Sequence, residues 1–141
     1  MLKGGYMKLR ERGREGKPEC MAILINLFFL LAIILFGDMK YEVSDDFVMD
    51  TILSGAYGSQ YDAHLLFSNM ILGYGLKLLY MLIPTVSWYF VMHITLCFLA
   101  LTSISFIILN ERTDVVGVTL TILFVSFFSD DLYLLVQFTK T

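Results

Sequence analysis

Charged residues, prolines and cysteines are all scarce in this sequence. Of its 141 residues, 16% are charged, two are prolines and two are cysteines, whereas 57% are hydrophobic. A soluble domain carries about 25% charged and about 45–50% apolar residues, so this composition is typical of a membrane protein. The same composition excludes an intrinsically disordered chain, which would contain few apolar residues.

The two cysteines predict neither a disulfide bond nor a metal site. Cys20 precedes the first apolar block of the sequence, and Cys97 lies inside the third. We expect them to stay apart, and no cysteine or histidine occurs at the spacing of metal ligands.

The hydrophobic residues form four long blocks rather than amphipathic stripes. The blocks are Met21–Phe36, Leu65–Ile83, Ser87–Leu109 and Val115–Phe128. A helix needs about 20 apolar residues to cross a bilayer. We therefore predict an all-α, polytopic membrane helix bundle with about four transmembrane spans. The fourth block is the weakest, since Ser129 follows after 14 residues, and a broken continuation through Leu132–Phe138 stays open.

The two flanks of the first block differ in charge. Residues 1–20 carry six basic and three acidic side chains, a net of +3, whereas residues 37–64 carry six acidic and one basic, a net of -5. Basic residues beside a span stay in the cytoplasm. We therefore predict a multi-pass protein of the cell membrane with four parts: a cytoplasmic tail (1–20), a first span (21–37), an external acidic loop (38–64) and the later spans (65–141). Nucleic-acid binding by the tail is rejected, and the segment Asn110–Asp114 is placed outside the cell.

Several residues of the later spans carry structural expectations. Gly73 and Gly75 would permit a close helix contact. Lys77 could extend its side chain toward the cytoplasmic interface. An aromatic belt is expected around the Pro84 turn. Its members are Tyr80, Trp88 and Tyr89.

The acidic loop contains the pattern of a short amphipathic helix. Ser44 is the expected N-cap, and Asp45 and Asp46 fall in the first turn, where the helix dipole favours carboxylates. The helix should end at Leu53 or Ser54, with Gly55 as the stop.

Some polar residues of the loop and its border could form a binding site. Asp46 and Asp50 are four residues apart, so their repulsion needs a compensating group. Asp62 and His64 precede the second apolar block, and Asn69 lies near its start. The candidate substrate-binding residues are Asp50, Asp62, His64 and Asn69. A solvated connector without binding function is the alternative.

Several segments of the chain together resemble a known group of proteins. They are Ser44–Phe47, Ile52–Tyr57, His64–Asn69, Pro84–Tyr89 and Gln137–Thr139. In these segments the chain resembles the amino-terminal part of polytopic membrane proteins from Firmicutes-type bacteria. Their layout is similar to that of GT-C-type glycosyltransferases, which use lipid-linked sugar donors. The group's proteins are longer, and the apolar ending of this chain also suggests part of a longer protein.

The resemblance implies a function and two catalytic residues. GT-C-type enzymes carry an acidic motif in the first external loop, so Asp45 or Asp46 would act as catalytic base or cation ligand. A divalent cation is the candidate cofactor, and a polyprenyl-phosphate sugar and the lipid bilayer are the candidate partners. The product would be cell-envelope polysaccharide. A non-enzymatic assembly or accessory protein and a transporter component are the alternatives.

Overall fold

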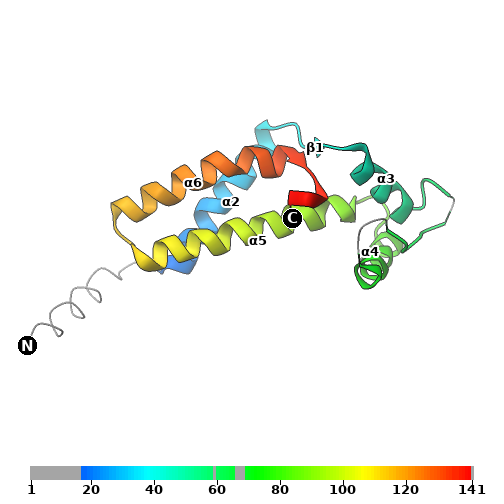
Figure 1. Ribbon diagram of the computed structural model, residues 1–141, viewed down its shortest axis with the longest axis horizontal. Coiled ribbons are helices and arrows are strands. Elements are labelled where there is room, and N and C mark those ends of the chain that lie inside the picture. Colours follow the sequence, from blue (N-terminus) through cyan, green and yellow to red (C-terminus); the bar gives the residue numbers. More distant parts are fainter. Residues whose placement is uncertain (1–16, 59, 66–68, 141) are drawn as a thin grey trace, which may run out of the picture. The chain divides into compact units, whose positions relative to one another are not determined.

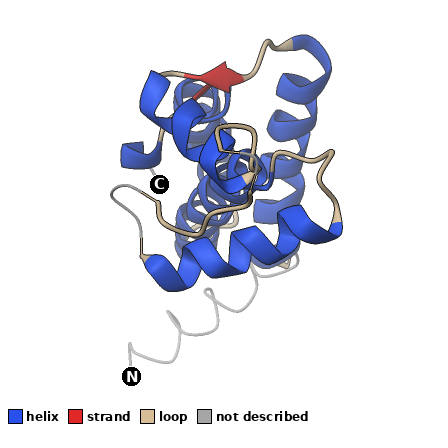
Figure 2. Cartoon of the chain, turned by 90° about the vertical axis from the view of Figure 1, so that its right-hand side faces the viewer, coloured by secondary structure: helices blue, strands red, loops and turns tan. Residues whose placement is uncertain are grey.

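The computed structural model describes residues 17–58, 60–65 and 69–140. In this part of the chain, helix predominates, and the strands are limited to one short pair (Figure 2). The all-α fold class predicted from the sequence is confirmed. Most of the basic tail, residues 1–16, lies outside the described residues.

Three helices of the described residues are long and apolar enough to cross a membrane. They are α2 (Pro18–Phe36), α5 (Trp88–Glu111) and α6 (Val115–Leu134), labelled in Figure 1. At 1.5 Å per residue they are about 28–36 Å long, which matches the hydrocarbon core of a bilayer. The chain therefore has the helices of an integral membrane protein.

The fourth apolar block forms a longer helix than its sequence indicated. Helix α6 continues without a break through Ser129 to Leu134, a length of 20 residues. It starts after Asp114, whose Oδ1 atom accepts a hydrogen bond from the Gly117 amide at 3.0 Å. A capped first turn and an unbroken backbone give this block the length to span a bilayer.

The second apolar block forms a shorter helix than the others. Helix α4 (Met70–Leu82) has 13 residues, about 20 Å, which falls short of the hydrocarbon thickness. It starts late because the Asn69 side chain accepts a hydrogen bond from the Ile71 amide at 2.9 Å and caps the helix. The described residues thus hold three helices of spanning length, where the sequence suggested about four.

The chain divides into two compact units, each considered by itself. In the first, residues 17–38 and 98–131, large apolar side chains point outward: Leu24 is 64% exposed and Phe28 68%. Buried Asn26 instead donates a hydrogen bond to Ser105 at 2.9 Å. Large apolar groups outside and paired polar groups inside are the pattern expected for helices surrounded by lipid.

The second unit, called the loop unit below, comprises the described residues from 39 to 97 and from 132 to 140. It contains β1 (Lys40–Tyr41), α3 (Ser44–Leu53), α4, the start of α5, β2 (Leu135–Val136) and the 3-10 helix η1 (Phe138–Lys140). Strands β1 and β2 pair in parallel. Its core consists of five buried side chains: Met49, Leu53, Leu76, Tyr80 and Tyr89.

The predicted aromatic belt is wrong for two of its three residues. Tyr80 is 1% exposed and Tyr89 is fully buried. Both pack in the core of the loop unit, because α3 covers the face of α4 that carries Tyr80.

The two glycines of α4 have different surroundings. A Cβ atom on Gly73 would lie 2.0 Å from the carbonyl oxygen of Ala63. Around Gly75, by contrast, there is open space. A close approach is therefore confirmed at Gly73, but its partner is the loop backbone and not a helix as predicted. At Gly75 the prediction is wrong.

Candidate functional site

Helix α3 presents the carboxylates of the acidic loop. It begins at Ser44, so Ser44 is the first helical residue and Val43 is the N-cap, with no side-chain capping bond. The predicted cap at Ser44 is therefore wrong, because strand pairing continues up to the Glu42 amide, which donates to the Val136 carbonyl at 2.9 Å. The predicted end is confirmed: the helix stops at Leu53, and Gly55 has a φ of 75°.

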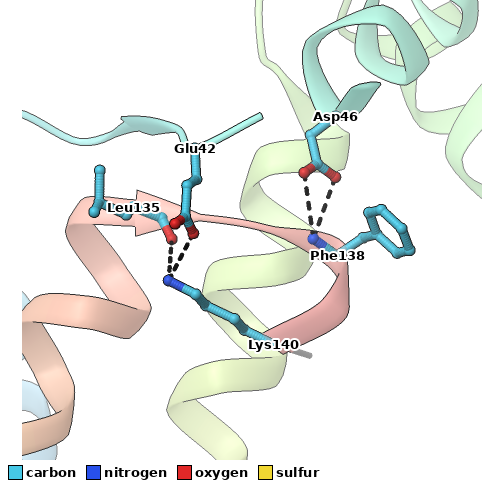
Figure 3. Close-up of polar contacts among 5 residues, drawn as sticks. All are labelled: Glu42, Asp46, Leu135, Phe138 and Lys140. Carbon is cyan, nitrogen blue, oxygen red and sulfur yellow. Dashed lines mark hydrogen bonds and ion pairs between the residues drawn. The ribbon is translucent and has the colours of Figure 1, made fainter. Parts of the chain in front are cut away.

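Asp46 is buried and anchors two other parts of the loop unit. Its Oδ1 atom accepts hydrogen bonds from the Tyr89 hydroxyl at 3.0 Å and from the Phe138 amide at 3.2 Å. Figure 3 shows both carboxylate oxygens directed at the Phe138 amide. Burial raises the pKa of Asp46, while the hydrogen bonds from Tyr89 and Phe138 act in the opposite direction.

The carboxyl-terminal segment, residues 135–140, is fastened to the acidic loop at a second point. The Lys140 Nζ atom lies 2.7 Å from Glu42 Oε2 and 3.4 Å from the Leu135 carbonyl oxygen (Figure 3). With the pairing of β1 and β2, these contacts make the segment an integral part of the loop unit.

Asp50 links α3 to α4 and α5. It accepts hydrogen bonds from the Tyr80 hydroxyl and, at 2.8 Å, from the Ser87 hydroxyl. Ser87 in turn lies 3.1 Å from the Tyr41 hydroxyl, which donates to it. Burial raises the pKa of Tyr41, so this hydroxyl keeps its proton. The compensating groups expected for Asp46 and Asp50 are therefore hydroxyl and amide donors of the chain itself.

Asp45 has a different environment from its neighbour. Its side chain is exposed, whereas Asp46 is fully buried. Asp45 and Ile52 are seven residues apart and therefore share one face of α3. About 10 Å of helix separates them along this face.

A hollow of about 680 Å³ lies at the Ile52 end of α3. Within it, His64 Nδ1 and Asp62 Oδ1 are 2.6 Å apart, and this hydrogen bond lowers the pKa of Asp62. The lining residues are Ile52, Tyr57, Gly58, Gln60, Tyr61, Asp62, His64 and Lys77. Lys77 thus turns toward the loop, not away from it as predicted from the sequence.

A second hollow of about 640 Å³ lies on another face of α3. It combines three aromatic side chains with the carboxylates of Glu42 and Asp50. The aromatic residues are Tyr41, Phe47 and Phe90. Asp50 is already engaged by Tyr80 and Ser87, which limits its capacity to bind a ligand.

The structure separates the predicted site residues into distinct places. Asp46 and Asp50 tie the loop unit together, Asp62 and His64 share a hollow, Asp45 is exposed, and Asn69 caps α4. Among the described residues, no group of three or more His, Cys, Asp and Glu side chains is arranged to hold a metal ion.

Sequence reasoning missed four contributors to this arrangement. Lys77 could have been found from the helical period, since it shares a face of α4 with Gly73 and Tyr80. The others gave no local signal, because their partners lie far away along the chain. They are Ser87, Tyr89 and the backbone amide of Phe138.

Comparison with known proteins identifies no relative of this chain. No family model, no curated protein and no solved structure matches it.

Proposed function

We propose that this chain is a GT-C-like glycosyltransferase, or the amino-terminal part of one, that takes a sugar from a lipid-linked donor for cell-envelope polysaccharide. The observation that supports this most is the contrast between two neighbouring carboxylates. Asp46 is buried and held by donors, while Asp45 beside it is exposed. One carboxylate fixes the helix, and the other is available to a substrate.

The chemistry of sugar transfer needs a base of this kind. The oxygen of an acceptor hydroxyl attacks the anomeric carbon of the donor sugar and forms the new glycosidic bond. The bond between that carbon and the phosphate oxygen breaks, and the lipid phosphate leaves with the electron pair. A carboxylate close to the attacking hydroxyl takes up its proton. Asp45 is our candidate for this base, and Asp46 positions it.

The surroundings of Asp45 fit a sugar substrate. Its face of α3 leads to the hollow with Tyr57, Tyr61 and the Asp62–His64 pair. Aromatic side chains and a few convergent polar groups are the usual components of a small-molecule site. In this proposal Asp62 and His64 belong to the substrate-binding part, and a divalent cation, if one is used, would arrive with the donor phosphate.

A non-enzymatic assembly or accessory protein is the second candidate. It is favoured by the use of Asp46 and Asp50 as anchors within the loop unit. On this hypothesis the acidic loop is a folded scaffold, and its exposed carboxylates have no catalytic role.

The two functions differ in the effect of one substitution. We would measure sugar transfer from polyprenyl-phosphate glucose and polyprenyl-phosphate mannose in membranes carrying the full-length protein, normalised to protein level. Asp45→Asn should lower transfer by about 10²–10⁴-fold, the usual contribution of a general base. Asp38→Asn, which removes one exposed carboxylate of the same loop, should leave transfer unchanged.

Equal transfer by wild type and Asp45→Asn would eliminate Asp45 as the base. Absence of transfer activity in the wild type, with a normally folded loop unit, would favour the accessory function. Asp46→Asn is not a substitute for Asp45→Asn, because it changes a buried side chain that anchors the fold.

A further inference from the structure

Lys77 lies in the loop unit but takes no part in the proton transfer proposed for Asp45. Lys77 lies on the face of α4 that also carries Gly73, Leu76 and Tyr80, all of them buried. This face packs against α3 and the loop backbone at Ala63. The side chain of Lys77 is therefore half-buried and lines the hollow of about 680 Å³ together with Tyr57 and His64.

The charge of Lys77 is not balanced by an ion pair within the described part of the chain. The acidic residue that lines the hollow, Asp62, is paired with His64, whose Nδ1 atom lies 2.6 Å from Asp62 Oδ1. Asp62 is thus engaged by His64, and the ammonium group of Lys77 has no carboxylate partner among the described residues of the hollow. A half-buried ammonium group is normally matched by an anion, so the hollow is suited to a negatively charged ligand.

We propose that this hollow binds a phosphate group together with the sugar or polyol attached to it. Lys77 donates hydrogen bonds to the phosphate oxygens, a role for which lysine is well suited. The hydrogen bond between Asp62 and His64 holds both side chains at the wall of the hollow. Tyr57, which is 77% exposed, provides a ring face for the sugar.

This inference deepens the proposed function, on which it rests for the identity of the ligand as the lipid-linked donor. A phospholipid such as phosphatidylglycerol offers the same chemistry, a phosphate joined to a polyol. The experiment must therefore compare the two sources. It must also measure binding without transfer, so that a failed proposal for Asp45 does not affect its result.

The test uses the full-length protein in nanodiscs of neutral phosphatidylcholine. Separate samples contain polyprenyl-phosphate glucose, polyprenyl phosphate or phosphatidylglycerol, and binding is measured by native mass spectrometry. Lys77→Gln should weaken binding of polyprenyl-phosphate glucose by at least about tenfold, the usual effect of losing a hydrogen bond to a charged group. Lys77→Arg should restore most of it. Lys40→Gln, the same change elsewhere in the loop unit, should alter binding less than about twofold.

A second variant tests the sugar. Tyr57→Ala should weaken binding of polyprenyl-phosphate glucose but leave polyprenyl phosphate unaffected. Equal weakening by Lys77→Gln and Lys40→Gln, or none by either, would overturn the proposal. Lys77-dependent binding of phosphatidylglycerol alone would support the phosphate site but reject the lipid-linked sugar as its ligand. An unchanged thermal midpoint of Lys77→Gln would show that the loop unit is still folded.

Discussion

At the scale of single residues, the carboxylates of α3 differ more in environment than their sequence suggests. Asp45, Asp46 and Asp50 lie within one short helix. Asp46 binds a backbone amide and a tyrosine, Asp50 binds tyrosine and serine hydroxyls, and Asp45 is exposed. Like charges four residues apart would weaken an isolated helix. Here Asp46 and Asp50 each accept hydrogen bonds from donors of their own, so the repulsion between the two carboxylates does not prevent folding.

The pKa of Asp46 leads to a prediction about stability and pH. Because burial raises this pKa in the folded protein, the folded state binds a proton more readily than the unfolded chain. The contribution of Asp46 to stability should therefore be complete below the unfolded pKa of about 3.9. It should decline as pH rises through the higher folded pKa.

Asp46→Asn provides the comparison for this prediction. The variant should lose this part of the pH dependence, which begins as pH rises above the unfolded pKa of about 3.9. At neutral pH it should be at least as stable as the wild type, because asparagine removes the buried charge. Its amide oxygen can still accept hydrogen bonds from the Phe138 amide and the Tyr89 hydroxyl. Chemical unfolding in detergent, followed by tyrosine and tryptophan fluorescence, would measure both effects. Identical pH profiles of stability in the wild type and Asp46→Asn would show that Asp46 is not the source of this pH dependence.

At the scale of elements, α4 is held against the loop by the absence of a side chain. The helix touches the Ala63 carbonyl at Gly73, and this contact directs the buried face of α4, with Lys77 at its edge, toward the loop. The same helix carries Gly75, for which no such constraint exists. The pair therefore separates the effect of close packing from the effect of helix propensity.

Gly73→Ala and Gly75→Ala should consequently have opposite effects. Alanine is favoured over glycine in a helix by up to about 1 kcal/mol, so Gly75→Ala should stabilise or be neutral. At Gly73 the new methyl group would meet backbone at 2.0 Å, and we expect a net loss of about 1–3 kcal/mol from overpacking. Unfolding midpoints of the two variants in detergent measure the difference. Equal midpoints would show that the contact at Ala63 contributes nothing.

At the scale of the whole molecule, the lengths of the described helices limit which of them can cross the membrane. Helices α2, α5 and α6 are long enough, and α4 is not. If α4 does not cross, the acidic loop and the start of α5 lie on the same side of the membrane. The connection between α5 and α6, residues 112–114, then lies on the other side. The sequence alone led us to place that connection outside the cell, so this is a revised prediction.

Labelling of single cysteines can test whether α4 crosses the membrane. In a background with Cys20 and Cys97 changed to Ser, Gln60→Cys should react with a membrane-impermeant maleimide in intact cells. This follows from the net charge of -5 in the loop and +3 in the tail, because basic flanks stay in the cytoplasm. Thr113→Cys should react only after the membrane is permeabilised. Labelling of both sites in intact cells would mean that α4 crosses the membrane. Protection of residue 60 would reverse the predicted orientation.

The sequence by itself determined the class of protein and most of its helices. Long apolar blocks predict helices in a lipid environment. Only a helix pairs all its backbone N–H and C=O groups internally without forming a closed barrel. The helix of the acidic loop and its end at Gly55 followed from local signals as well. These features depend on residues close together in the chain, so periodicity and capping patterns reveal them.

Only the tertiary structure decided what the polar residues of the loop do. Asp46 meets Phe138, which is 92 residues away, and Asp50 meets Ser87, 37 residues away. Tyr80 and Tyr89 lie in a core rather than at the membrane interface, and Lys77 faces the loop. The physical reason is that a carboxylate, a hydroxyl or an ammonium group binds whichever partner the fold brings to it. Distant partners leave no periodic pattern in the sequence.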